Sequence, residues 1–179
     1  MELNHDIIDT PPRDSASVVM LRDSADGLQV LLMRRHTDSA VLGGAYVFPG
    51  GKVDAADSAP EMLALLDRPM AELHARVAEP ALTPEQAAAF YVAAAREAAE
   101  ESGLLYLQVG AAEIAEHSAA TCERLRAGEA FAALLAEHGA RLDTDALAPW
   151  VRWITPRRPS VMNKRFDTRF FVDRAPEGL

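Results

Sequence analysis

The feature that most constrains this chain is a helix whose two ends are both marked in the sequence, between Thr83 and Gly103. Thr83 suits the N-cap, Pro84 suits the first turn, and Gln86 stands where a capping box places its partner. Gly103 tolerates the left-handed conformation in which many helices end. Apolar residues recur at helical spacing in between: Ala87, Phe90, Tyr91, Ala94 and Ala98. We therefore expect one long helix with a buried side.

The last turns of this helix carry a charged run, REAAEESGL, from Arg96 to Leu104. Glu97, Glu100 and Glu101 stand at i, i+3 and i+4, which places their carboxylates on one face. Three repelling carboxylates favour a bound cation, and ligands with oxygen donors only suit Mg²⁺ or Mn²⁺. Arg96 lies four residues before Glu100 and can hold a carboxylate in place. A solvated charged face is the alternative interpretation, but the position of the run at the rim of the buried side favours a metal site.

A glycine pair, Gly50 and Gly51, ends the segment FPGG after a short predicted strand. Glycine allows the backbone to approach a ligand closely. The carbonyl of Gly51 is therefore a candidate to join the carboxylates on the metal. A simple turn is the alternative interpretation of the pair.

Together the two segments resemble the Nudix box, whose pattern is GX5EX7REUXEEXGU with U a bulky aliphatic residue. REAAEESGL matches the second half with Ala98 at one U position, and GKVDAAD matches the first half with Asp57 in place of the first glutamate. Residues 58–95 fill the gap, which makes 38 residues where the pattern has seven and hence an insertion of 31. The resemblance implies that Glu97, Glu100 and Glu101 bind the metal. It also implies that Glu100 or Glu101 doubles as a base and that Arg96 orients; a role for the shorter Asp57 stays open.

A split box that follows FPGG resembles the peroxisomal-type CoA diphosphatase branch of the Nudix hydrolases. The upstream signature of that branch, LLTxR(S/A)x3Rx3Gx3FPGG, is matched by Leu31, Leu32, Arg35 and Gly44, whereas Met33, His36 and Ala40 depart from it. The downstream segments WITP and RFDTRFFV point the same way.

The resemblance implies a metal-dependent hydrolase that cleaves the diphosphate of a small-molecule nucleoside diphosphate derivative, with CoA or acyl-CoA as the leading substrate. One alternative is a Nudix hydrolase for ADP-ribose or a dinucleotide. Another is a catalytically silent Nudix-like module that binds a nucleotide.

The net charge of −9 argues against nucleic acid as a partner. The charge is uneven, because residues 150–174 hold seven Lys or Arg against two Asp, which gives this segment +5 and the remainder −14. A basic strip on an acidic protein can bind a small polyanion. Arg165 and Arg169 of this strip are therefore candidates for phosphate binding, and a solvated charged loop is the alternative for the strip. Arg35, which ends a predicted strand and matches the arginine of the CoA signature, is a further candidate.

Residues 1–15 are predicted to form a flexible arm, and residues 16–179 a single Nudix domain with a helical insertion at about 58–82. Apolar runs predict a hairpin of residues 17–21 and 28–35, and further strands at 147–154 and 166–172. Strands on both sides of a capped helix indicate an α+β fold with a mixed sheet. This is also the Nudix-like α/β/α sandwich that the resemblance implies.

Neither a signal peptide nor an apolar run long enough to span a membrane is present, and the single Cys122 fits a reducing compartment. The sequence thus predicts a soluble, cytoplasmic protein. Members of the resembled family continue past the RFDTRFF strand through more sheet and a final helix, whereas this sequence stops at Leu179. The resemblance therefore implies that one layer of the expected sandwich is incomplete. Either the C-terminal part is truncated or a homodimer supplies the cover.

Overall fold

In the described residues five strands form a mixed sheet, and the long strand β1 pairs with three of the other four. The computed structural model describes residues 6–37, 43–108, 111–158 and 164–175. β1 (Arg13–Ser24) pairs antiparallel with β2 (Gly27–Val30) near its end and with β5 (Gly50–Lys52) near its start. On its other side β1 pairs parallel with β9 (Phe166–Arg174), and β9 pairs antiparallel with β8 (Ala148–Ile154). The glycine pair is thus a strand of the sheet.

Two small pairs of strands accompany the sheet. β3 (Met33–Arg34) pairs with β4 (Tyr46–Val47), and β6 (Leu107–Gln108) pairs with β7 (Arg141–Leu142). The predicted hairpin is confirmed, although its second strand is divided into β2 and β3.

The helices agree closely with the sequence patterns. They are η1 (Ala55–Ser58, a 3-10 turn), α1 (Pro60–Leu63), α2 (Met70–Val77), α3 (Pro84–Ser102), α4 (Ala111–Arg126) and α5 (Phe131–Glu137). The insertion at about 58–82 therefore contributes α1 and α2, and η1 ends at its first residue.

α3 begins and ends where its signals predict. The Thr83 hydroxyl accepts a hydrogen bond from the Gln86 backbone N–H at 3.2 Å, and the Gln86 side chain accepts one from the Thr83 N–H at 2.9 Å. Gly103 ends the helix with a φ of 80°. The burial differs from the expectation, because residues 87–96 are buried on all sides rather than along one stripe. Alanine fills many of these positions, which allows α2, α4 and the sheet to approach the helix backbone closely.

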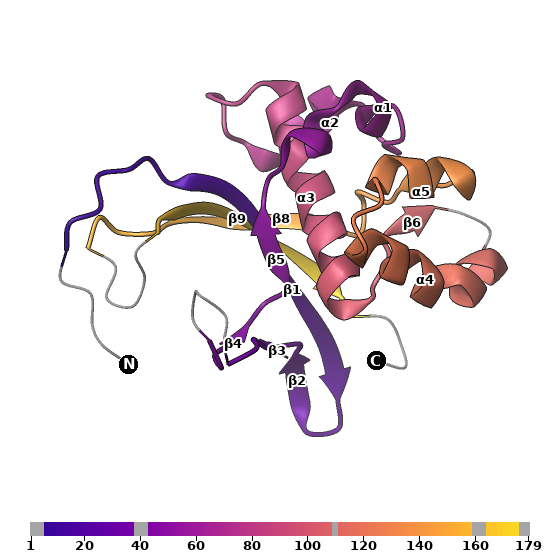
Figure 1. Cartoon of the computed structure of the whole chain (residues 1–179), viewed down its shortest axis with the longest axis horizontal. Coiled ribbons are helices and arrows are strands. Elements are labelled where there is room, and N and C mark those ends of the chain that lie inside the picture. The colour runs from indigo at the N-terminus through magenta and orange to yellow at the C-terminus, as the bar shows by residue number, and fades with distance from the viewer. Residues whose placement is uncertain (1–5, 38–42, 109–110, 159–163, 176–179) are drawn as a thin grey trace.

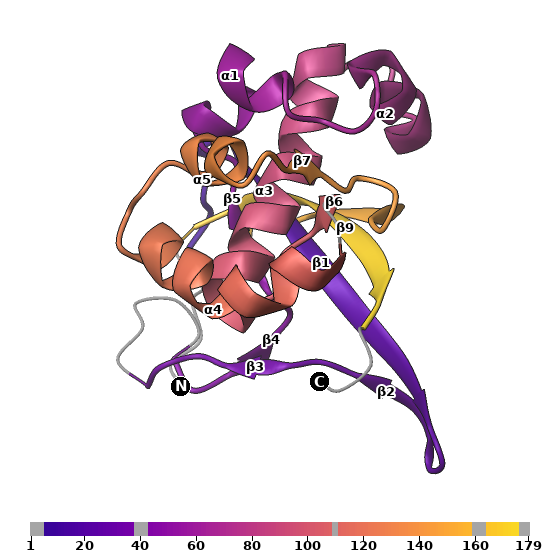
Figure 2. The ribbon, with the colours of Figure 1, turned by 90° about the vertical axis from the view of Figure 1, so that its right-hand side faces the viewer.

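The predicted α+β fold with a mixed sheet is confirmed. In Figures 1 and 2 the helices of the described residues lie on one face of the sheet, with α3 against it. Among the described strands, β8 forms one edge of the sheet and exposes Trp150 and Trp153, while β2 and β5 form the opposite edge. None of the helices in the described ranges is long and apolar enough to cross a membrane.

Two local expectations need correction. β1 starts at Arg13, so the last three residues of the expected arm belong to the sheet, while residues 1–5 of the arm lie outside the described residues. In β9 the sequence alternates around Phe166, Thr168 and Phe170, which predicts that this face is the buried one. The fully buried face instead holds Asp167, Arg169 and Phe171, because α3 covers that side.

Candidate active site

Arg96 is the centre of the candidate site. Its side chain is 11% exposed, and its Nε and Nη2 donate to the two oxygens of Asp57 at 2.8 and 3.0 Å. Its Nη1 donates to Glu97 at 2.9 Å and to Glu100 at 3.2 Å, and its Nη2 also donates to the Lys52 carbonyl at 2.9 Å. One guanidinium therefore ties α3 to β5 and to η1. Its planar fork fixes the position of two of the predicted glutamates.

The glycine pair lies directly against these glutamates. The Gly50 N–H donates to Glu101 at 3.0 Å, and a Cβ built on Gly51 would collide with the carboxylate of Glu97. The insertion therefore leaves FPGG adjacent to the glutamates. Only glycine, which has no side chain, fits at position 51 of β5 opposite the Glu97 carboxylate.

Burial and mutual repulsion act on two of the carboxyl groups. Burial raises the pKa of Glu97 above its usual value, against the Arg96 charge that lowers it, and Glu100 and Glu101 raise it further. Burial likewise raises the pKa of Glu101, while the Gly50 N–H and the Arg35 charge lower it and Glu100 raises it. The negative charge of the cluster is thus only partly compensated by the protein.

The glutamates suit a divalent cation by donor type and by charge. Their bonds to Arg96 and Gly50 use one oxygen each of Glu97, Glu100 and Glu101. Across the described part of the chain, no three side chains of His, Cys, Asp or Glu are gathered closely enough to hold a metal ion. In this arrangement the carboxylates of Glu97 and Glu100 are bound to Arg96. The feature that favours a cation is therefore the negative charge of the three glutamates that Arg96 leaves uncompensated.

Asp57, whose role the sequence left open, acts on Arg96. It is 1% exposed, and besides both bonds to Arg96 it accepts the Asp54 N–H at 2.8 Å, which closes the η1 turn. Both oxygens are therefore engaged. Asp57 positions the arginine rather than facing a ligand.

Arg35 lies where it can act on the cluster. Its charge lowers the pKa of Glu101, so the two groups attract each other electrostatically. Its Nε is buried and, within the described ranges, has no hydrogen-bond partner. Ala40, where the CoA signature has a second arginine, lies outside the described residues.

Arg165 and Arg169, the other predicted phosphate-binding residues, lie apart from the glutamates. Arg169 is buried and donates to both oxygens of Glu79 at 2.9 and 2.8 Å and to Asp14 at 2.9 Å, with its guanidinium 4.1 Å from the centre of the Phe90 ring. Arg165 donates to the Thr155 carbonyl at 3.0 Å. This corrects the expectation that Arg169 faces a phosphate, because its donors are already used to anchor the insertion to the sheet.

A cavity beside the site was not anticipated from the sequence. It has a volume of about 730 Å³ and lies between η1, α1, α3 and the α4–α5 pair, with Arg96 and Glu100 in its wall. The apolar spacing of Met62 and Leu65 was the available signal. No local pattern, however, indicates that these residues meet the α4–α5 pair.

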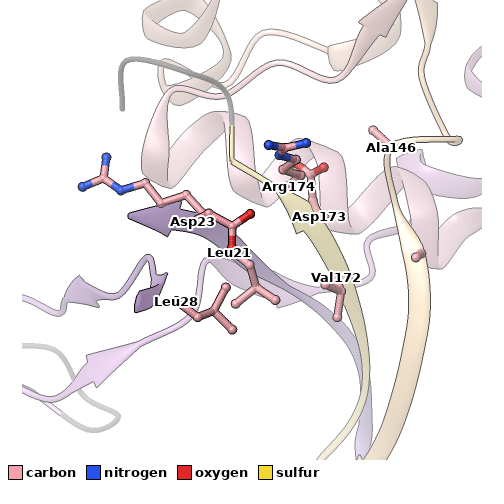
Figure 3. Close-up of a pocket in the computed structure, with 9 residues that line it drawn as sticks. Leu21, Asp23, Leu28, Ala146, Val172, Asp173 and Arg174 are labelled. Atoms are coloured by element: carbon pink, nitrogen blue, oxygen red, sulfur yellow. The ribbon is translucent and has the colours of Figure 1, made fainter. Parts of the chain in front are cut away.

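A second pocket lies at the C-terminal end of β1 (Figure 3). The glutamates lie near β5, which pairs with the N-terminal part of β1. The pocket has a volume of about 420 Å³, and Leu21, Leu28 and Val172 line it together with Asp23 and Arg174. None of the predicted site residues lines it.

Comparisons with known proteins agree with this geometry. The family model described as the NUDT19 Nudix domain matches residues 10–176. The chain is similar to acyl-coenzyme A diphosphatase NUDT19 of Homo sapiens, with 31% identity over 181 residues that cover 83% of this chain and 48% of the relative. The protein of the same name from Gallus gallus is 31% identical over 183 residues, with 80% of this chain and 47% of the relative covered. The chain thus spans about half the length of these curated relatives.

A solved structure has the same architecture. The crystal structure of a NUDIX hydrolase from Alicyclobacillus acidocaldarius superposes with a TM-score of 0.67 and 30% sequence identity. The match covers 93% of this chain and 71% of that chain.

Proposed function

Because this chain belongs to the family of NUDT19 Nudix domains, we propose that it hydrolyses the diphosphate linkage of CoA or acyl-CoA. The observation that carries the proposal is the cluster of Glu97, Glu100 and Glu101, held by Arg96 against the glycine pair. The name of the curated relatives, acyl-coenzyme A diphosphatase, supports this substrate class.

We assign the binding of Mg²⁺ or Mn²⁺ to the three glutamates, with the Gly51 carbonyl as an additional oxygen donor. When bound, such a cation would polarise the phosphoryl oxygens and make a bound water more acidic. Arg96 keeps Glu97 and Glu100 on the side of α3 that faces β5. A bound cation would draw these two carboxylates partly away from Arg96, because no three carboxylates of the described residues are at present gathered closely enough to hold it.

The chain must also accept a proton from the attacking water. Glu101 is suited to this step, because burial and the nearby Glu100 raise its pKa and a raised pKa makes a carboxylate a better proton acceptor. The Gly50 N–H holds the Glu101 side chain in place. Arg35, whose charge lowers the pKa of Glu101, would offset part of the charge of the diphosphate.

The proposal is tested by single replacements of the glutamates. We expect Glu100→Gln and Glu101→Gln to lower kcat at least about 100-fold for the best substrate, because a neutral amide neither binds the cation nor accepts the proton. Glu85→Gln, an exposed residue in the first turn of the same helix, is the matched control. Activity would be measured with CoA, acyl-CoA, ADP-ribose and a diadenosine polyphosphate, each with Mg²⁺ and with Mn²⁺. Turnover near that of the wild type in both glutamine variants would remove the site assignment.

A further inference from the structure

The cavity between the insertion and the α4–α5 pair shares two residues with the candidate active site. Arg96 and Glu100 belong to its wall, and both also belong to the cluster that would hold the diphosphate. Val92, Arg96 and Glu100 lie one turn apart on α3, and all three line the cavity. The cavity therefore extends along one side of that helix, from Glu100 toward the N-terminal end of the helix. A ligand whose diphosphate lies at Glu100 can therefore extend into this space.

The inner part of the cavity is apolar. Met62 and Leu65 come from the insertion, Val92 from α3, and Leu125 and Phe131 from the α4–α5 pair. Its volume of about 730 Å³ falls in the usual range for small-molecule sites, about 300–1,000 Å³. The space is large enough for a flexible chain with amide groups and several methylenes.

The charges around the cavity select between the two ends of such a ligand. Five carboxylates and one guanidinium line it, those of Asp54, Asp57, Glu61, Glu100, Glu129 and Arg96. Arg96 is already bound to Asp57, and Arg124 pairs with Glu129, so the remaining charge is negative. An end that carries a further phosphate is repelled here, whereas an uncharged end is not.

A CoA thioester has two unlike ends joined at the diphosphate. The adenosine end carries an additional phosphate, while the pantetheine arm is uncharged and ends in the thioester and its acyl chain. We propose that this cavity receives the pantetheine arm and the first carbons of the acyl chain, an inference that rests on the proposed CoA diphosphatase function. The adenosine end, with its additional phosphate, then lies outside this cavity. The insertion that splits the Nudix box thereby supplies one wall of the substrate site.

The test fills the cavity without disturbing the core. Ala133 and Ala136 line the cavity and are solvent-exposed, so Ala133→Phe and Ala136→Phe add volume at its mouth. Ala64→Phe is the matched control, because Ala64 is an exposed alanine of the insertion that does not line the cavity. Thermal melting of each variant confirms that it is folded.

The probes are the two products of CoA cleavage, with binding measured by calorimetry. Addition of water across the diphosphate gives 4′-phosphopantetheine and adenosine 3′,5′-bisphosphate. We expect both filled variants to weaken the binding of 4′-phosphopantetheine at least about tenfold and to leave that of adenosine 3′,5′-bisphosphate within about twofold. Ala64→Phe should change neither.

The outcomes separate this inference from the proposed function. Unchanged binding of 4′-phosphopantetheine in the filled variants, an equal loss for both products, or no binding of 4′-phosphopantetheine by the wild type would overturn the inference. Hydrolysis of CoA by the wild-type protein tests the proposed function independently. If CoA is cleaved while the filled variants bind both products normally, the function stands and the cavity assignment falls.

Discussion

At the scale of single residues, the site depends on how the Arg96 guanidinium is shared. Asp57 takes two of its N–H groups, and Glu97 and Glu100 share a third donor. Burial alone would lower the pKa of Arg96, but the ion pairs with Asp57 and Glu97 raise it, so the arginine stays charged. Asp57 thus determines where Arg96 holds the glutamates.

The first prediction concerns Asp57. We expect Asp57→Asn to lower the free energy of unfolding by about 2 kcal/mol or more, because it leaves a buried guanidinium with a weaker partner. It should also lower kcat about 10- to 100-fold through misplaced glutamates. Asp54→Asn is the control, since Asp54 is 55% exposed and 3.7 Å from Arg96, and should change the unfolding free energy by less than about 0.5 kcal/mol. Chemical denaturation and steady-state kinetics measure the two effects. An unchanged kcat would contradict the positioning role of Asp57, and an unchanged unfolding free energy would contradict the stabilising role of its ion pair with Arg96.

The second prediction concerns Gly51. A methyl group at this position would occupy the space of the Glu97 carboxylate, so Gly51→Ala should displace that side chain and lower kcat about 10- to 100-fold. In a Glu97→Ala background the collision is absent, so adding Gly51→Ala should lower kcat by a further factor of less than about two. Kinetics of the four proteins form a double-mutant cycle. Independent effects of the two substitutions would show that Gly51 does not act through Glu97.

At the scale of elements, the insertion is anchored to the sheet. Glu79, which follows α2, receives two bonds from Arg169 of β9 and one ion pair from Arg152 of β8 at 2.9 Å. Its side chain is 17% exposed and that of Arg169 is 6% exposed, so the pair is largely removed from water. The insertion is therefore a fixed part of the domain, packed on α3, rather than a loose addition.

The third prediction tests this anchor. Glu79→Gln should lower the free energy of unfolding by about 3 kcal/mol or more, because it leaves the buried Arg169 without its main counter-charge. Glu72→Gln in α2 is the matched control. Glu72 is 53% exposed and, among the described residues, forms an ion pair with Arg68 alone, so its replacement should lower the free energy of unfolding by less than about 1 kcal/mol. Equal midpoints of denaturation for the two variants would show that the anchor does not stabilise the fold.

The elements also show what the sequence could predict. The ends of α3 and the adjacency of the glutamates were predictable, since caps and i, i+4 spacing are local signals. The pairing of Arg169 with Glu79 was not, because the partners are 90 residues apart and a charged strand residue looks the same whether it faces solvent or a buried carboxylate. The cavity escaped prediction for the same reason: its walls come from separate segments that meet only through packing on α3.

At the scale of the whole molecule, an acidic chain holds carboxylates that repel one another where the proposed cation binds. The chain carries a net charge of −9, and burial together with mutual repulsion raises the pKa values of Glu97 and Glu101. Without a cation these carboxylates oppose one another in the folded state. Folding stability and cation binding should therefore be coupled.

The last prediction follows from this coupling. A cation that binds only the folded protein, at 100 times its dissociation constant, adds about 2.7 kcal/mol of stability, which corresponds to a rise in Tm of about 5–10 °C for a domain of this size. We expect Mn²⁺ or Mg²⁺ to produce such a rise in thermal melting and a chelator to reverse it. In Glu97→Gln and Glu101→Gln the rise should largely disappear, while the metal-free variants should melt no lower than the wild type because a repelling charge has been removed. Glu72→Gln should keep the full response, and an equal response in all of these proteins would mean that the cation binds elsewhere.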